Sequence, residues 1–566
     1  MATESTAIAW RDWGASTFGE AEARSRPILL YLHASWCRWC RVMEAEVFAD
    51  PELARLVATE LIPVRVDTDR NPHVRDRYIA GGWPTIAFLT PTGEVLWAST
   101  YLPVAELQEA ARSVLSAWSS GREALTAEIQ KRRQALDAAR ARRTSTAIVR
   151  RESADDVVAW LQENFDPRNG GFGTAPKFPA CDAVELALLQ GLVARDPNAL
   201  AMAERTLDGM LAGELYDRID GGFFRYALDD DWTRPQYEKL LLDNAGMLRC
   251  LALAGHLLRR PDYTEAAAAA VRWARAQLGR DDGLWGSSVA ADDAYYTSDR
   301  QGPPPPRDLT AFTDSNAAWA RALADAGGRL ASEDWVDEAR ATLTALWRAV
   351  ATDGPIHHAS DGQGVRGLLN DIVELGRACV SVAQATGDAE WMERARQLAG
   401  RLEQDLLADD GGFLDWLPDA DAVGALGHRD RPFESNAAAA LLMLDLWYYT
   451  GGRGCRAMAE RTLAQLGAQA PRFGSAAATY ALAVHAFFEP PLQVVIVGAP
   501  DASAALRQAA LALPLPQRRV WTLPQGGRFG GRELPAQPGP AAYLWSRSGR
   551  SAPLTNAEEL RSAAQR

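Results

Sequence analysis

Short apolar runs and one stretch of helical spacing organise the first 120 residues. Residues 27–33, PILLYLH, and 61–67, LIPVRVD, predict two buried strands. Between them, residues 41–61 place apolar side chains at helical intervals, so the strand, helix, strand order predicts a parallel pair. Residues 85–98, TIAFLTPTGEVLWA, predict a hairpin with a proline and glycine turn. A helix over 107–118 completes an α/β domain.

Helical patterns dominate the following 400 residues, and glycine-aromatic loops interrupt them six times. These loops begin near Asp166, Asp217, Asp281, Thr352, Asp409 and Pro471, and an apolar helix follows each one. The heptapeptide AMAERTL occurs at both 201–207 and 457–463, and such repetition is typical of stacked units. Alternating amphipathic and apolar helices predict a closed ring of twelve, an (α/α)6 barrel, with the apolar helices inside. An open solenoid is the alternative, but the repeat spacing varies too much for it.

The sequence therefore predicts a multidomain chain. We expect an α/β domain over 1–120, a charged helical linker over 121–150, the (α/α)6 barrel over 151–490 and a small C-terminal α/β extension over 491–566. The extension begins strand, helix, strand but lacks a GxGxxG loop, so we expect a cap on the barrel instead of a nucleotide site.

Composition and net charge argue against some classes of partner. Of the 566 residues, 47% are hydrophobic and 23% charged, and the net charge of -13 argues against a nucleic acid partner. We find neither a secretory signal nor an apolar run of membrane-spanning length, so we expect a cytoplasmic protein with no membrane partner. In that location the six cysteines should not form a structural disulfide framework. We also predict no metal and no cofactor.

The motif SWCRWCRVME at residues 35–44 supplies the clearest chemistry. It places Cys37 after the first predicted strand and at the start of a helix, where free backbone N–H groups, Arg38 and Arg41 favour a thiolate. Cys40 lies one turn further on, where it can resolve a mixed disulfide. We therefore interpret Cys37 and Cys40 as a catalytic redox pair. A zinc site that adds His33 and His73, or a purely structural pair, are the alternatives.

A second motif, GGWPT at residues 81–85, accompanies the cysteines. Pro84 begins the strand that should run beside the cysteine loop, where a cis bond would expose backbone groups to a substrate peptide. We expect Trp36, Trp83 and Pro84 to form a substrate-docking groove. The other four cysteines stand alone in helical contexts and read as small buried apolar residues.

Residues 10–118 resemble the DUF255 family, typified by spermatogenesis-associated protein 20. The resemblance rests on SWCRWCRVME, on VFADPELA and on GGWPTIAFLTPTGEVL, in that order. It implies an N-terminal thioredoxin fold and an (α/α)6 barrel, with a poorly defined cellular role. Arg38 and Arg41 stand where the family usually carries histidines, so an acid-base or metal role of those positions is lost. Tyr31 occupies the register of thioredoxin's buried acidic residue, which leaves no identified proton acceptor for Cys40.

Polar residues recur at the starts of the predicted inner helices. Helix capping explains such positions, and convergence on a carbohydrate site at one mouth of the barrel is the alternative. The candidates for this barrel pocket are Tyr226, Trp232, Tyr237, Glu238, Asp243, Trp285, Asp314, Asp371 and Glu434. Gln236 replaces a histidine of the family's corresponding motif, which removes one acid or base. We interpret His357 and His358 as polar surface residues.

We thus expect a thiol-disulfide oxidoreductase-like protein that uses Cys37 and Cys40 on a protein or small-molecule thiol or disulfide, with the barrel selecting the partner. A carbohydrate-active barrel of the epimerase or isomerase type, with a carbohydrate ligand, is the first alternative. A non-catalytic scaffold is the second, so whether the chain is an enzyme stays open.

Overall fold

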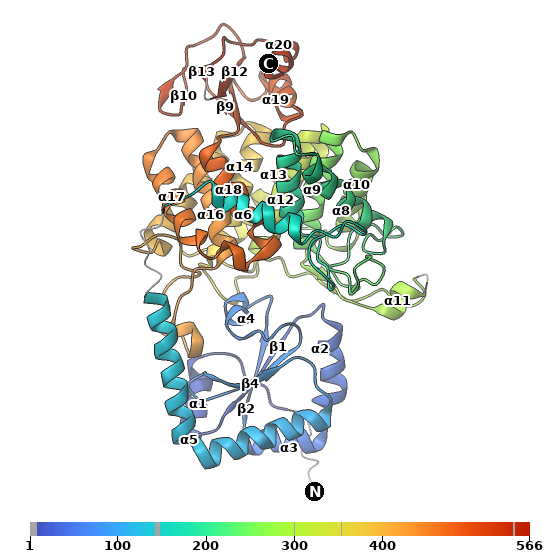
Figure 1. Cartoon of the computed structure of the whole chain (residues 1–566), viewed down its shortest axis with the longest axis vertical. Helices are drawn as coiled ribbons and strands as arrows, with labels where there is room; N and C mark the ends of the chain where they lie inside the picture. The colour runs from blue at the N-terminus through green and yellow to red at the C-terminus, as the bar shows by residue number, and fades with distance from the viewer. Residues whose placement is uncertain (1–7, 142–147, 299, 352–353, 547–548, 566) are drawn as a thin grey trace. The chain divides into compact units, whose positions relative to one another are not determined.

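The chain folds into two compact units in the computed structural model, which describes residues 8–141, 148–298, 300–351, 354–546 and 549–565 (Figure 1). Unit 1 comprises Met1–Ser145 together with two later segments, Ala290–Pro306 and Trp416–Asp430. Unit 2 contains the rest. The contiguous division predicted from the sequence did not include the two later segments of unit 1.

Unit 1 contains a four-stranded sheet with the order β2-β1-β3-β4. Its strands are β1 (Ile28–His33), β2 (Ile62–Asp67), β3 (Thr85–Leu89) and β4 (Val95–Ser99). β1 runs parallel to β2 and antiparallel to β3, and β3 and β4 form an antiparallel hairpin. β1 and β3 are almost wholly buried, as expected for the centre of a sheet. The predicted strands and the thioredoxin-like α/β class are confirmed.

The single helix predicted over 41–61 is wrong. The chain instead forms α2 (Arg38–Val42), a π-helical turn over Met43–Val47, and α3 (Pro51–Glu60). Pro51 cannot continue a preceding helix because it lacks an N–H and its ring crowds the previous turn. The Asp50 carboxylate accepts a hydrogen bond from the Leu53 N–H at 2.8 Å and so caps the new helix.

Four further α-helices belong to the described part of unit 1: α1 (Ala15–Arg24), α4 (Pro72–Tyr78), α5 (Val104–Ala141) and α11 (Asp293–Thr297). A short 3-10 helix spans Gly424–Gly427. α5 begins where the predicted helix over 107–118 was expected and continues through most of the predicted linker. The backbone leaves helical geometry at Gly121, where the two parts of α5 meet. Residues 142–147 of the linker lie outside the described residues.

Unit 2 contains a bundle of helices (Figure 1), and the contacts among them form a closed ring. The inner helices are α7 (Cys181–Val193), α9 (Leu241–Leu258), α12 (Thr313–Leu330), α14 (Leu369–Thr386), α16 (Phe433–Thr450) and α18 (Ala478–Phe488). Each contacts the next, and α18 contacts α7, which closes the ring. The outer helices are α6 (Glu152–Glu163), α8 (Pro197–Ala212), α10 (Pro261–Gln277), α13 (Glu333–Val350), α15 (Ala389–Arg401) and α17 (Arg453–Gly467). The predicted (α/α)6 barrel is confirmed, and the open solenoid is excluded.

Buried asparagines near the starts of three inner helices fasten the glycine-aromatic loops. The side-chain oxygens of Asn244, Asn316 and Asn436 accept hydrogen bonds from the backbone N–H groups of Phe223, Trp285 and Phe413 at 2.8, 2.9 and 2.6 Å. Their amide groups donate back to the carbonyls of the same three loop residues. The N-cap residues of these helices make no side-chain capping bond, so helix capping was the wrong explanation for these asparagines.

The C-terminal extension forms a second α/β layer within unit 2. β8 (Leu492–Val497) runs parallel to β9 (Arg518–Leu523), and α19 (Ala504–Leu511) connects them, as predicted. β12 (Ala541–Ser546), β13 (Gly549–Arg550) and α20 (Ala557–Ala564) complete it, and the sheet order is β13-β12-β8-β9. The extension contacts the inner helices α12 and α14 through α19 and β9. Gln384 of α14 accepts a hydrogen bond from the Val520 N–H at 3.0 Å.

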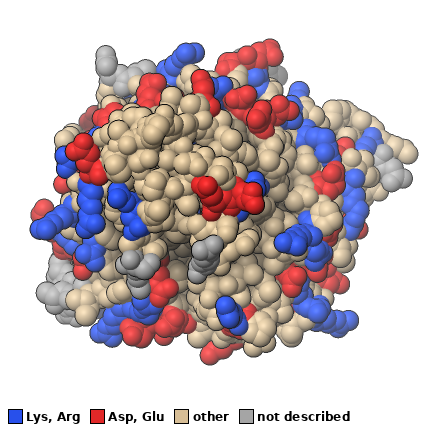
Figure 2. Space-filling model, turned by 90° about the horizontal axis from the view of Figure 1, so that it is seen from above, with Lys and Arg blue, Asp and Glu red and all other residues tan. Residues whose placement is uncertain are grey.

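Short strands complete unit 2. β5 (Lys239–Leu240), β6 (Ser288–Val289) and β7 (Arg307–Asp308) form a small sheet, and β10 (Arg528–Phe529) pairs with β11 (Arg532–Glu533). Basic and acidic side chains are interspersed over the face shown in Figure 2, with no continuous basic area. Among the described residues, no helix is both long and apolar enough to cross a bilayer. The cytoplasmic location stays a prediction.

The asparagine contacts predict a large effect of Asn316→Ala on stability. The substitution leaves the backbone N–H and carbonyl groups of Trp285 without partners in a buried site, so we expect a loss of about 2–4 kcal/mol of unfolding free energy. Urea denaturation checks this. Asn198→Ala, at an exposed position of α8, is the control and should change the free energy by less than about 0.5 kcal/mol. Equal effects of the two substitutions would contradict the proposed contact.

Candidate functional site

Cys37 and Cys40 lie together at the start of α2. Cys37 is the N-cap residue, and its sulfur accepts a hydrogen bond from the Cys40 backbone N–H at 3.1 Å. Both cysteines are free thiols and both are buried, with 5% and 2% of their surface exposed. A sulfur that faces the unpaired N–H groups of a helix is held where negative charge is favoured. This is the position that the sequence predicted for Cys37.

The buried surroundings of Cys40 favour its protonated thiol. Burial, followed by its hydrogen bond with Cys37, raises the pKa of the Cys40 thiol far above its usual range. The Tyr31 hydroxyl donates to the Cys40 carbonyl oxygen at 3.2 Å, and the Glu44 carboxylate lies 3.4 Å from the same hydroxyl. Tyr31 therefore fills the space beside Cys40 and connects it to a carboxylate at the surface.

The three residues predicted to form a docking groove surround the cysteine loop. The rings of Trp36 and Trp83 meet edge to face, with centroids 5.1 Å apart. The Trp36 N–H donates to Asp69 and the Trp83 N–H donates to Thr68, each at 2.8 Å. The bond between Trp83 and Pro84 is cis. Trp36 and Pro84 are buried and Trp83 is half-buried, so Trp83 offers the most accessible surface of the three.

The later segment 290–306 of unit 1 reaches the cysteine loop. Its two ends are joined by a hydrogen bond from the Ala290 N–H to the Pro306 carbonyl at 2.8 Å. The Ala291 N–H donates to the Trp36 carbonyl at 3.1 Å, directly beside Cys37. We call its described residues, 290–298 and 300–306, the covering segment.

Arg38 and Arg41 hold the covering segment. Arg38 forms an ion pair with Asp293, and Arg41 donates to the Ala291 carbonyl oxygen. The Arg38 and Asp293 side chains remain 43% and 41% exposed, so their attraction is worth only about 0–1 kcal/mol. The two arginines were expected to favour a thiolate at Cys37. The structure shows that both are also engaged in contacts with the covering segment.

The zinc alternative finds no geometric support. Within the described ranges, the three side chains that come within metal-ligand distance of one another are Asp314, His358 and Asp371, and neither Cys37 nor Cys40 belongs to this group. His73 instead lies against Trp416, with ring centroids 5.3 Å apart. Burial and then the nearby Arg65 lower the pKa of His33 to about 4, so His33 is neutral at pH 7.

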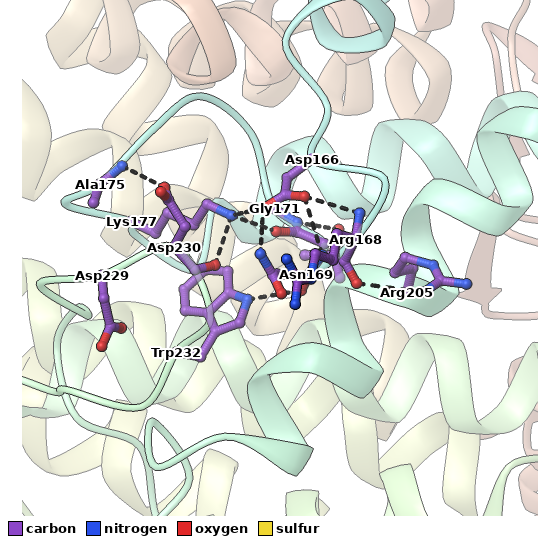
Figure 3. Close-up of polar contacts among 12 residues, drawn as sticks. Asp166, Arg168, Asn169, Gly171, Ala175, Lys177, Arg205, Asp229, Asp230 and Trp232 are labelled. Atoms are coloured by element: carbon purple, nitrogen blue, oxygen red, sulfur yellow. Dashed lines mark hydrogen bonds and ion pairs between the residues drawn. The ribbon is translucent and has the colours of Figure 1, made fainter.

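Two predicted pocket tryptophans lie inside the helical packing. Trp232 is fully buried and its ring N–H donates to the Asn169 carbonyl at 3.0 Å, beside the Lys177 ammonium that binds Asp166 (Figure 3). Trp285 is 4% exposed, and its ring N–H donates to the Thr342 hydroxyl. Both rings are thus held by internal partners.

Two predicted tyrosines pack against neighbouring aromatic rings. Tyr226 stacks on the exposed Phe178 with centroids 4.7 Å apart, and Tyr237 meets Phe224 edge to face. Both tyrosines are half-buried. They therefore offer aromatic surface, whereas the buried tryptophans do not. Glu434 lies in the first turn of α16.

Glu238 and Asp243 form an acidic pair near Arg225. Glu238 is 3% exposed and lies 3.6 Å from the Arg225 guanidinium. Burial raises the pKa of Asp243 to about 6, against the attraction of Arg225. Burial also raises the pKa of Glu238, and Asp243 adds to that effect. Two neighbouring carboxylates with raised pKa values can share acid and base roles near neutral pH.

Asp314 and Asp371 come together around a histidine. The His358 Nδ1 lies 2.9 and 3.1 Å from the two oxygens of Asp371, and both residues are at most 3% exposed. Asn370 donates to Asp314 at 3.2 Å. Burial, with a contribution from Asp314, raises the pKa of Asp371 to about 6. This group could hold a divalent cation or a proton.

The prediction that His358 is a surface residue is wrong. His358 lies in a hairpin whose backbone folds back onto itself, since its N–H donates to the Val365 carbonyl. That turn places Asp371, thirteen residues later, against its ring. The informative signal was a histidine in the loop that precedes an acidic helix start. His357 is half-buried.

The N-terminal region is similar to a known protein family. Residues 1–137 match the family model Thioredox_DsbH, described as a protein of unknown function, DUF255. The resemblance to DUF255 is confirmed. The match includes the whole sheet of unit 1 and both cysteines of the site.

Two curated relatives extend the comparison. Spermatogenesis-associated protein 20 of Homo sapiens is 28% identical over 310 residues, which are 50% of this chain and 39% of that protein. Thiol:disulfide interchange protein DsbD 1 of Pseudomonas aeruginosa is 39% identical over 83 residues, 14% of each chain. The chain therefore spans well under two thirds of the length of either relative.

One solved structure is similar over the larger part of the chain. Cellobiose 2-epimerase from Bacillus thermoamylovorans B4167 superposes with a TM-score of 0.47 at 11% identity and covers 55% of this chain and 85% of that one. The ring of helices in unit 2 is established independently, by the contacts among its own inner helices.

The raised pKa of Asp243 predicts a pH-dependent gain in stability for Asp243→Asn. The folded state keeps the proton of Asp243 up to about pH 6, whereas the unfolded chain loses it near pH 4, so ionisation destabilises the fold as the pH rises. We expect Asp243→Asn to add about 1–3 kcal/mol of unfolding free energy at pH 7.5 and almost nothing at pH 4. Denaturation at both pH values tests this. Asp501→Asn at an exposed position is the control, and a gain that does not change with pH would contradict the account.

Proposed function

We propose that this protein exchanges thiols and disulfides through Cys37 and Cys40. The Cys37 thiolate attacks one sulfur of a substrate disulfide, forms a mixed disulfide and releases the other sulfur as a thiolate, which takes up the proton that Cys40 gives up in the next step. The Cys40 thiol then loses its proton and attacks Cys37, which releases the second substrate thiol and leaves a Cys37–Cys40 disulfide. Two electrons pass to the substrate, and a dithiol reductant restores the pair.

The observation that supports this proposal best is the unequal environment of the two sulfurs. The Cys37 sulfur accepts a hydrogen bond from a backbone N–H at the start of a helix. The raised pKa of Cys40 keeps its thiol protonated until the mixed disulfide has formed. Attack first by Cys37 and then by Cys40 follows from this difference. DsbD 1 of Pseudomonas aeruginosa, which is similar to residues of this chain, is a thiol:disulfide interchange protein, and this agrees with the same chemistry.

The covering segment sets a condition on substrate access. Cys37 is 5% exposed, and the Arg38, Arg41 and Trp36 contacts of the segment lie on both sides of it. One exposed ion pair and a few hydrogen bonds contribute about 1 kcal/mol each to a contact. Separating the covering segment from the cysteine loop therefore costs only a few kcal/mol, about 1 for each contact, which thermal motion supplies at room temperature. We propose that a protein or small-molecule disulfide reaches Cys37 when this segment moves aside, and that Trp83 then lines its path.

Serine substitutions in the full-length protein test the exchange. With dithiothreitol as reductant, we expect Cys37→Ser to abolish insulin disulfide reduction because no nucleophile remains. Cys40→Ser should accumulate a mixed disulfide at Cys37, which mass spectrometry detects. Cys455→Ser, outside the site, should reduce insulin as fast as the wild type. Equal insulin reduction by the wild type and Cys37→Ser would refute the proposal.

A second candidate function rests on the His358, Asp371 and Asp314 group. A histidine 2.9 Å from a carboxylate whose pKa is about 6 can transfer protons near neutral pH, as an epimerase or isomerase of sugars requires. The group lies at the starts of inner helices, where the sequence suggested a carbohydrate pocket. This candidate is independent of the cysteines.

Sugar binding distinguishes the second candidate from the first. If the barrel is carbohydrate-active, some monosaccharide or disaccharide of a broad panel should raise the melting temperature of the wild type, and Asp371→Asn should remove that shift. Cys37→Ser should retain it. No shift with any sugar speaks against the second candidate alone, and inertness of both sites would favour the scaffold alternative.

A further inference from the structure

A cavity of about 130 Å³ lies inside the ring of unit 2, on the side that the C-terminal extension covers. All six inner helices contribute side chains to it, and residues 516–520 of the extension also line it. A single water needs only about 10–15 Å³ of such space, so the cavity can hold a small molecule together with water.

Six arginines line this cavity: Arg249, Arg321, Arg329, Arg377, Arg518 and Arg519. Four of them have carboxylate partners. Arg249 pairs with Asp182 and Glu185, Arg321 and Arg377 pair with Glu374 at 3.2 and 3.0 Å, and Arg519 pairs with Asp445 at 2.5 Å. The guanidinium charges of these four are therefore compensated within the protein.

Arg329 and Arg518 have no such partner. Arg329 donates to the Leu515 and Pro516 carbonyls at 3.2 and 3.1 Å. Arg518 is 7% exposed and donates through Nε to the Ala510 carbonyl at 2.9 Å. In the described part of the chain, neither guanidinium lies within 4.0 Å of a carboxylate, and the Nη atoms of Arg518 have no hydrogen-bond acceptor.

Uncompensated buried guanidinium groups destabilise a fold strongly. Burial lowers the pKa of Arg329 to about 10 and lowers that of Arg518 as well, with Arg329 adding to the effect on Arg518 and with Asp325, beyond ion-pair distance, opposing both shifts. Arg518 is buried, whereas Arg329 is half-buried. Asp325 also lines the cavity, and within the described residues it forms no ion pair. Six arginines thus face five carboxylates, which are those of Asp182, Glu185, Asp325, Asp445 and the neighbouring Glu374. The cavity therefore has an excess of one positive charge, and the Asp325 carboxylate is an unused hydrogen-bond acceptor.

We infer that this cavity binds a small oxyanion, a carboxylate or phosphate group, through Arg329 and Arg518. Guanidinium groups present paired N–H donors that match the oxygens of either group. Asp325 can accept a hydrogen bond from a hydroxyl of the same ligand, so hydrogen phosphate and hydroxycarboxylates fit best. This site is separate from the cysteines and independent of the proposed function.

Thermal-shift titration and calorimetry of the full-length protein test the site, with sodium phosphate, citrate, and sodium chloride at matched ionic strength as probes. We expect phosphate, citrate or both to raise the melting temperature saturably, and chloride to have no such effect. A response to phosphate alone assigns a phosphate ligand, and a response to citrate alone assigns a carboxylate. No saturable response to either anion overturns the inference.

Substitutions locate the response in the cavity. Arg518→Gln should abolish the shift, whereas Arg396→Gln on the exposed face of α15 should retain it. Arg518 also donates a hydrogen bond to the Ala510 carbonyl, so Arg518→Gln could fail to fold. A second variant keeps the test decisive in that case. Asp325→Asn keeps an acceptor oxygen but removes a negative charge, so it should lower the half-saturating anion concentration about five- to ten-fold. An unchanged concentration in Asp325→Asn, or a retained shift in Arg518→Gln, contradicts the inference.

Discussion

The hydrogen bond from the Cys40 N–H to the Cys37 sulfur is the interaction on which the proposed chemistry depends. It exists because β1 ends at His33 and α2 begins at Arg38, so Cys37 becomes the N-cap residue and its sulfur faces an unpaired backbone donor. The same geometry buries Cys40 one turn later, where its thiol stays protonated. A strand-to-helix junction thus makes two chemically identical side chains unequal.

The arginines beside these cysteines show how neighbouring residues can change the use of a shared motif. Arg38 and Arg41 replace the histidines usual in the related family, and both reach the covering segment. Arginine cannot release a proton near neutral pH, but its fork of donors suits a carboxylate or a carbonyl. The site has therefore exchanged two titratable groups for two fixed contacts. In the proposed mechanism, access to Cys37 depends on a segment that lies about 250 residues later in the chain.

The fold was largely predictable because its elements have clear periodicity. The runs at 27–33 and 61–67 became parallel strands, and the apolar helices became the inner ring. Pro51 marks the break in the sequence, but the helical spacing of apolar residues on both sides of it favours one continuous helix. The covering segment could not be predicted, since a contact between residues 41 and 291 leaves no local pattern.

The candidate sites also differ in how far the sequence alone could predict them. Cys37 and Cys40 are close in sequence, so their pairing could be predicted from spacing. The partners His358 and Asp371 depend on a hairpin that brings the loop onto the next helix. The arginine cavity gathers side chains from six helices, and its signal is a polar stripe at every fourth residue of α12, Arg321, Asp325 and Arg329. Such a stripe on an inner helix is informative once the ring is known.

The most direct test of the central claim is the order in which the two cysteines react. Alkylation of the reduced, full-length protein with iodoacetamide at pH 7, followed by peptide mass spectrometry over time, measures both rates in one sample. The account predicts that Cys37 is modified at least ten-fold faster than Cys40, because the pKa of Cys40 is raised by burial. Equal rates, or faster modification of Cys40, would contradict it.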